Sequence, residues 1–149
     1  MKDWGKELYK EWVEKKLMPD LLGEVCRYTG YEGNFNINYK SKYTLNPTPE
    51  MVARKKGDSW KTEIRIKRPE LSTNTPWDVF FYGWSLIGEA LHAADVSNNG
   101  KPTLSERVVH LNAFYMMKRY MRNNYRNWYR ANRRVLEAMT SILTFTPVD

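Results

Sequence analysis

Residues 103–143 read TLSERVVHLNAFYMMKRYMRNNYRNWYRANRRVLEAMTSIL, and this stretch decides the fold class. On a helical wheel with 100° per residue, apolar side chains gather on one side: Met117, Met121, Trp128, Val135, Met139 and Ile142. The stripe holds its phase over roughly five turns, which predicts an amphipathic helix with this face buried. Thr103 and Glu106 have the spacing of a capping box, which predicts where the helix begins. The predicted helix is long for a chain of 149 residues, so the sequence leaves room for a kink or break near its middle.

The opposite side of this predicted helix is lined with arginine. An arc of roughly 120° contains Arg119, Arg122, Arg126, Arg130, Arg133 and Arg134. No acidic residue lies between Glu106 and Glu137, so the like charges repel one another without relief inside the helix. Lysine outnumbers arginine eleven to four before residue 75, whereas seven arginines and one lysine follow from residue 107 onward. The planar guanidinium group binds phosphate or carboxylate bidentately, so this choice of residue favours an anionic partner.

Other polar side chains lie among these arginines. Asparagine amides and tyrosine phenols can bind phosphate, sugar or base edges, and aromatic rings can stack on bases. We therefore predict that a ligand with the phosphates of nucleic acid or of a nucleotide is bound by the six arginines together with Lys118 and Tyr129. A secondary basic face is predicted on the strand region: Arg54, Lys61, Arg65 and Lys67.

Four alternatives explain the arginine stripe without an outside ligand. The stripe is solvated, or it pairs with acids of the N-terminal helix (Glu7, Glu11 and Glu14), or it is buried against a second copy of the chain, or it lies on a membrane surface. Neutralisation by carboxylates of the same chain or of a second copy would leave no vacancy for an anion from solution.

Helical patterns also precede this stretch. Thr75 and Pro76 open a predicted helix over residues 76–95, with Asp78 placed favourably in its first turn. Residues 97–100 (Ser-Asn-Asn-Gly) are typical of a turn. At the other end of the chain, residues 3–29 are predicted to be helical, with Asp3 as N-cap, a break at Pro19 and a stop at Gly30.

Between these helical parts, residues 34–68 have the period of strands. Apolar residues at odd positions from Phe35 to Leu45 predict one long strand, bent near Ser41, or two strands joined by a three-residue loop. Residues 50–55 are ambiguous, and residues 56–58 (Lys-Gly-Asp) are typical of a hairpin turn. Residues 60–67 alternate strictly between apolar or uncharged and charged side chains. We expect a small antiparallel sheet of about three strands, apolar on one face and basic on the other.

The whole pattern predicts an α+β fold with N-terminal helices, a small sheet and two long C-terminal helices, in a single domain over residues 1–149. The formal net charge of +7 and the pI near 9.5 favour partners such as nucleic acid, phosphorylated ligands, acidic proteins or anionic lipid. One cysteine, Cys26, excludes a disulfide within the chain and a cysteine metal cluster. The lack of a long apolar run predicts no membrane span and a cytoplasmic location.

Two groups of residues resemble parts of catalytic sites. Glu89, His92 and Asp95 lie three residues apart on one predicted helix, as in carboxylate-bridged metal sites, but such sites need a second helix of the same kind. Asp58, Glu63 and Arg65 resemble the spacing of a metal nuclease, except that Arg65 cannot act as a neutral proton acceptor. We predict no cofactor.

Three functions remain in order of preference. The first is a non-enzymatic basic protein that binds nucleic acid or a nucleotide-type ligand, of the compact, aromatic-rich kind found among viral, phage or mobile-element accessory proteins. The second is a structural or adaptor subunit of a homo-oligomer or larger particle, suggested by the surplus of aromatic residues. The third is a metal-dependent enzyme that uses Glu89, His92 and Asp95.

Overall fold

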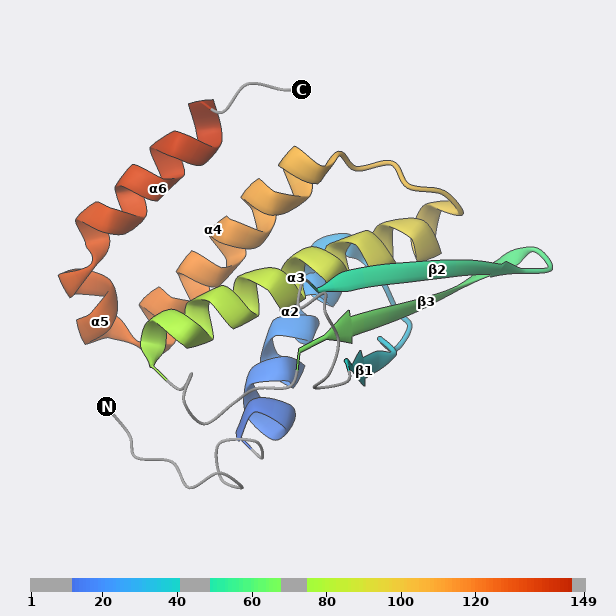
Figure 1. Ribbon diagram of the computed structural model, residues 1–149, viewed down its shortest axis with the longest axis horizontal. Coiled ribbons are helices and arrows are strands. Elements are labelled where there is room, and N and C mark those ends of the chain that lie inside the picture. The colour runs from blue at the N-terminus through green and yellow to red at the C-terminus, as the bar shows by residue number, and fades with distance from the viewer. Residues whose placement is uncertain (1–11, 41–48, 68–74, 146–149) are drawn as a thin grey trace.

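The structure is a computed structural model, which describes residues 12–40, 49–67 and 75–145 (Figure 1). The elements in chain order are η1 (Val13–Leu17), α2 (Met18–Thr29), β1 (Ile37–Tyr39), β2 (Glu50–Lys56), β3 (Ser59–Ile66), α3 (Pro76–Asn99), α4 (Glu106–Asn124), α5 (Arg126–Ala131) and α6 (Arg133–Phe145). This order confirms the predicted α+β fold. No helix of the described ranges combines the length and apolar character that crossing a membrane requires.

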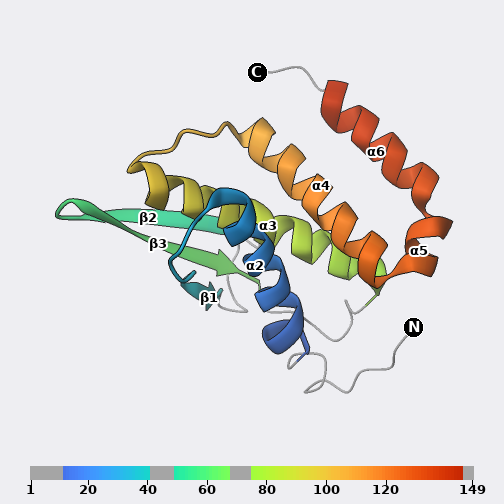
Figure 2. The ribbon, with the colours of Figure 1, turned by 180° about the vertical axis from the view of Figure 1, so that it is seen from behind.

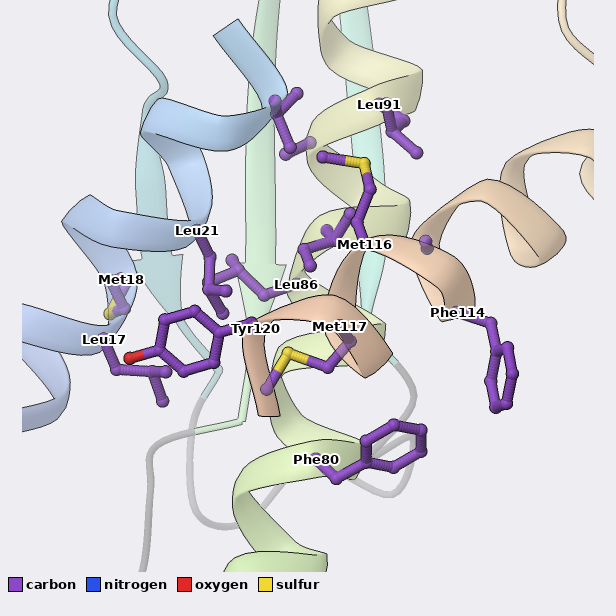
Figure 3. Packing of buried hydrophobic residues seen from close by; sticks show 14 of the residues in the cluster. Leu17, Met18, Leu21, Phe80, Leu86, Leu91, Phe114, Met116, Met117 and Tyr120 are labelled. Atoms are coloured by element: carbon purple, nitrogen blue, oxygen red, sulfur yellow. The ribbon is translucent and has the colours of Figure 1, made fainter. Parts of the chain in front are cut away.

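Helix α3 is the centre of the molecule, since α2, α4, β2 and β3 all pack against it. Figure 1 and, from behind, Figure 2 show α3 running along the sheet, with α4 beside it and α6 on the far side of α4. The buried side chains come from every layer, and Figure 3 shows Leu21, Leu86 and Met117 meeting between α2, α3 and α4. Burial of this apolar surface is the main stabilising term of the fold.

The three strands form a mixed sheet in the order β1-β3-β2, so the prediction of an antiparallel sheet is wrong for β1. β1 pairs in parallel with β3, through hydrogen bonds from Ile64 N–H to the Asn36 carbonyl (2.8 Å) and from Lys40 N–H to the Ile66 carbonyl (3.0 Å). Because β3 lies between β1 and β2, the chain reaches β2 by crossing β3 rather than through a hairpin. β1 ends at Tyr39, and the predicted continuation toward residue 46 lies mostly outside the described residues.

β2 and β3 form the predicted hairpin. Gly57 has a φ of 61°, a left-handed conformation that glycine adopts without steric cost, so the turn falls where the sequence placed it. The ambiguous residues 50–55 belong to β2. Ile64 and Ile66 are buried under α3, and Met51 of β2 is paired with Ile64 on the same face.

The helix around Pro19 is continuous, so the predicted break there is wrong. Proline cannot donate a backbone hydrogen bond, and its ring crowds the carbonyl of the preceding turn. A π-helical turn, η1, ends at Leu17, two residues before Pro19, and Met18 N–H donates to the carbonyl of Val13, five residues earlier. This wider turn accommodates the ring. The predicted stop at Gly30 is confirmed, with a φ of 73°.

Helix α3 begins at the predicted residue and ends later than predicted. Thr75 accepts the N–H of Asp78, and the Asp78 carboxylate accepts the N–H of Thr75, which completes a capping box. The helix continues past Asp95 to Asn99, and Gly100 ends it with a φ of 69°. The predicted turn at residues 97–100 is therefore mostly helix.

The predicted C-terminal helix is three helices. Its N-cap is Ser105 and not Thr103, since Ser105 accepts the N–H of Val108. The chain leaves helical geometry at Tyr125 (φ −137°, ψ 56°) and again at Asn132 (φ −109°, ψ 11°). After these two breaks α6 runs back alongside α4 (Figures 1 and 2).

Packing explains why the helix breaks. Trp128 of α5 lies against Trp77 and Phe80 of α3, with ring centroids 4.8 Å and 6.1 Å apart, and Leu136 of α6 is 1% exposed. A straight helix would carry Trp128 and Leu136 away from the core. Asn124 and Asn132 serve the breaks, because their amides donate to the carbonyls of the residues four positions earlier, Tyr120 and Trp128.

Candidate functional site

Four arginines at the turn from α4 through α5 into α6 are exposed: Arg122, Arg126, Arg130 and Arg134. We call this set the arginine corner. Within the described residues none of the four forms an ion pair. Since the chain reverses here, the charges gather at one end of the α4–α6 pair rather than along a straight helix. Their repulsion is not offset by any acidic residue of residues 107–136.

Helix geometry raises the positive potential of this corner. Arg133 and Arg134 occupy the first turn of α6, the end at which the dipole of a helix is positive. No acidic residue lies in the first turn of α5 or of α6. Cations at a helix N-terminus are electrostatically unfavourable, so a bound anion would stabilise the arrangement.

The other two predicted arginines are paired within the protein. Arg119 lies 3.5 Å from Glu24 of α2, which also contacts Arg27 at 2.7 Å. Arg133 contacts Glu137 at 3.1 Å, one turn along α6. Of the acids expected as partners, Glu14 instead accepts the hydroxyl of Tyr39, whereas Glu7 and Glu11 lie outside the described residues.

Two further predicted ligand residues are used in packing. Lys118 is half-buried, with its Nζ 3.4 Å from the Thr140 hydroxyl and 5.1 Å from the centroid of the Tyr115 ring. The contact joins α4 to α6. Tyr129 is half-buried against the core. The side chains of Lys118 and Tyr129 thus contribute to packing more than to a surface open to a ligand.

The predicted secondary basic face carries mixed charge. Arg54, Lys61 and Arg65 lie on the outer face of the sheet, since Arg54 is paired with Lys61 across the strands, and Lys67 is exposed just after β3. Glu63 lies on the same face and contacts Arg65 at 3.1 Å. The hydrogen bond from Arg65 lowers the pKa of Glu63, and the same bond raises the pKa of Arg65. The acids weaken this face as an anion site.

A second candidate site is a pocket of about 280 Å³ between α3 and α4. Glu89 and His92, two of the three residues in the enzyme hypothesis, line it. Asp95 does not, because its carboxylate binds the backbone N–H groups of Thr103 and Leu104. No three histidine, cysteine, aspartate or glutamate residues of the described ranges are arranged to hold a metal ion.

Helix α4 adds Glu106 and His110 to this pocket, two residues that sequence reasoning had not joined to Glu89 and His92. Glu106 contacts His92 Nε2 at 3.1 Å. The sequence signal that could have joined Glu106 and His110 was their spacing, since residues four apart share one helix face. Burial raises the pKa of Glu89, against the opposing charge of His92, and Glu106 raises it further.

The chain matches no family model, and comparison with curated proteins and with solved structures also finds no match.

Proposed function

We propose that this chain is a non-enzymatic protein that binds the phosphate groups of nucleic acid through the arginine corner. The observation that carries the proposal is the presence of four exposed arginines without an ion pair in the described structure. Cations on a helix surface ordinarily alternate with acids, which lower the repulsion. Here the phosphates of a polyanion supply that neutralisation.

Arginine suits this ligand better than lysine would, because its guanidinium group donates two parallel hydrogen bonds to one phosphate. Exposed amides flank the arginines at Asn123 and Asn127, and they can bind sugar or base edges. The corner follows a bend in the chain, which favours contact with consecutive phosphates of a backbone rather than with one small anion.

The test is fluorescence anisotropy of a labelled oligonucleotide, as duplex and as single strand, titrated at several salt concentrations. If all four arginines neutralise phosphates of a duplex, the logarithm of affinity falls with the logarithm of salt with a slope of about −3 to −4. The double variant Arg122→Glu, Arg126→Glu is expected to weaken binding by at least about tenfold and to flatten that slope by about 2.

Lys55→Glu, Lys56→Glu is the matched control. Both lysines are exposed at the β2 end of the hairpin, and the control makes the same change in net charge. An equal loss of affinity in both double variants would show that net charge alone attracts the oligonucleotide. Binding that survives the arginine variant, or that is missing in the unaltered protein, would overturn the proposal.

A structural subunit is the second candidate, because two large apolar side chains of α6 face solvent. Val135 is 50% exposed and Ile142 67%, and their spacing of seven residues places them on one helix face. A second copy of the chain is the occupant this candidate requires. Light scattering tests this candidate. It would be favoured over phosphate binding by a sharply defined oligomer that does not bind oligonucleotide and that dissociates in the double variant Val135→Ser, Ile142→Ser.

A further inference from the structure

The pocket between α3 and α4 differs in charge from the rest of the protein. The chain carries 24 lysine and arginine residues and a net charge of +7. None of those lysines and arginines is among the described residues that line the pocket. Two carboxylates, Glu89 and Glu106, do line it. The sign of the local charge is thus opposite to that of the whole molecule.

No lysine or arginine of the described residues forms an ion pair with the Glu89 carboxylate. It lies on α3 and is half-buried, with a backbone hydrogen bond from Met51 and the ring of His92 near it. His92 is itself engaged with Glu106, and Glu50 adds a further negative charge. A charged carboxylate removed from water without a lysine or arginine partner costs free energy, which a cation from outside would offset.

Aromatic rings of the same helix also line the pocket. Phe81 and Trp84, one turn apart on α3, line the pocket, and Phe81 is 47% exposed although it is large and apolar. The Trp84 indole N–H donates to the carbonyl of His110 at 3.0 Å, which fixes this ring against α4. Faces of aromatic rings attract organic cations, and tryptophan does so most strongly.

We propose that this pocket binds a small organic cation, with an alkylammonium group held between the carboxylates of Glu89 and Glu106 and the rings of Phe81 and Trp84. The volume of about 280 Å³ is just below the usual range for small-molecule sites, so it suits a ligand of a few carbon atoms. Carboxylates select the charge and the rings select the alkyl groups. This function is separate from phosphate binding at the arginine corner.

Choline and its neutral isostere 3,3-dimethylbutan-1-ol are the probes, because they share shape and differ in charge. The readout is the NMR signal of the Trp84 indole N–H, assigned with Trp84→Phe. Choline is expected to shift this signal saturably and to bind at least about tenfold more tightly than the neutral alcohol. Equal affinity for the two probes, or no saturable shift with choline, would overturn the proposal. Both results are measured on the unaltered protein, and Trp84→Phe serves only to assign the signal.

Glu89→Gln keeps the shape of the side chain and removes its charge, so it is expected to weaken choline binding by about tenfold. Glu63→Gln, which removes a carboxylate on the outer face of the sheet, is expected to leave choline binding unchanged. Unaltered choline affinity in Glu89→Gln would contradict the proposal that this carboxylate binds the cation. Oligonucleotide binding is measured on the same samples, and its retention in Glu89→Gln separates a failure here from a failure of the proposed phosphate binding.

The pH dependence adds an independent measurement. The groups that face Glu89 are His92 on its own helix, Glu106 on α4 and Glu50 on β2, and His110 shares the pocket. Burial raises the pKa of Glu89, so this carboxylate gains its proton sooner than an exposed one as pH falls, and the pocket then loses negative charge that would attract a cation. Choline affinity is expected to fall with decreasing pH, and an increase would contradict the proposal.

Discussion

The carboxylate of Asp95, near the end of α3, accepts the backbone N–H of Thr103 at 2.7 Å. The same carboxylate accepts the N–H of Leu104 at 3.0 Å and the amide of Asn99 at 2.9 Å, and it contacts the Thr103 hydroxyl. Asp95 is 5% exposed and thus buried although it is charged. One side chain therefore satisfies the backbone of the turn that leads from α3 into α4.

Asp95→Ala is expected to lower the free energy of unfolding by about 2–4 kcal/mol, because the backbone N–H groups of Thr103 and Leu104 lose their acceptor. Urea unfolding measures the change. Glu32→Ala, at an exposed loop position, is the control and is expected to change stability by less than about 0.5 kcal/mol. Equal effects of the two substitutions would show that the Asp95 contacts contribute little.

The same carboxylate predicts a loss of stability in acid. Burial alone would raise the pKa of Asp95, but the hydrogen bonds from Thr103, Leu104 and Asn99 outweigh burial and hold the pKa below its usual value. A pKa that is lower in the folded state means that the stabilisation is complete above the unfolded value of about 3.9 and is lost as pH falls through the folded value. The stability difference between the unaltered protein and Asp95→Asn should shrink over that interval. A constant difference would contradict this prediction.

Glu89→Gln is expected to stabilise the protein at neutral pH. Burial raises the pKa of Glu89, so the folded state resists its ionisation, and stability falls as pH rises from the unfolded value toward the folded one. The neutral amide escapes this penalty. Thermal unfolding at a series of pH values should show the advantage of Glu89→Gln vanishing in acid, below the unfolded pKa of about 4.3. A less stable variant at neutral pH would refute the prediction.

Gly83 and Gly88 of α3 predict opposite results for the same substitution. A Cβ on Gly83 would lie 2.5 Å from Met117 Cε and 3.0 Å from Leu21 Cδ1, so Gly83→Ala is expected to cost about 1–3 kcal/mol through overpacking. A Cβ on Gly88 would meet its nearest neighbour at 3.9 Å, an ordinary contact. Gly88→Ala is expected to gain about 0.5–1 kcal/mol from helix propensity. Chemical denaturation compares the stability of the two variants. A more stable Gly83→Ala variant would show that α2 and α4 can move to make room for the added Cβ.

Leu136 is expected to hold α6 in place. It is buried to 1% exposure, so Leu136→Ala should cost about 2–5 kcal/mol or release α6 locally. Ile142 of the same helix is 67% exposed, and Ile142→Ala should change stability by less than about 0.5 kcal/mol. Amide hydrogen exchange of residues 133–144 distinguishes local release from global destabilisation. Matching losses for both residues would mean that α6 packs differently.

Where local chemistry determined the backbone, the sequence predicted the structure. The strict alternation of uncharged and charged side chains over residues 60–67 predicted β3. Gly57 predicted the hairpin turn, and Thr75 with Pro76 predicted the start of α3. Each signal acts through a few neighbouring residues, such as a left-handed φ or a cap hydrogen bond. Such signals do not depend on the rest of the fold.

Where distant contacts determined the backbone, the sequence was insufficient. Alternation along residues 37–39 carries no information on strand direction, so the parallel pairing with β3 was missed. The helical pattern of residues 103–143 continued through Tyr125 and Asn132, because what breaks the helix is the packing of Trp128 and Leu136 against other elements. The phosphate ligand of the arginines is still a prediction. The pocket could not be predicted from the sequence, because it depends on which faces of α3 and α4 meet.

The order of the strands also limits how copies of the protein can associate. β1 and β2 are the outer strands of the sheet, and β1 is three residues long. A second chain laid parallel and in register along β2 would set the consecutive cations of residues 54–56 against their own counterparts. Such edges are poor templates for adding strands, and natural proteins use short and lysine-rich edges to resist aggregation. Self-association of this protein should therefore proceed through helical surfaces, and its sheet should not seed fibrils.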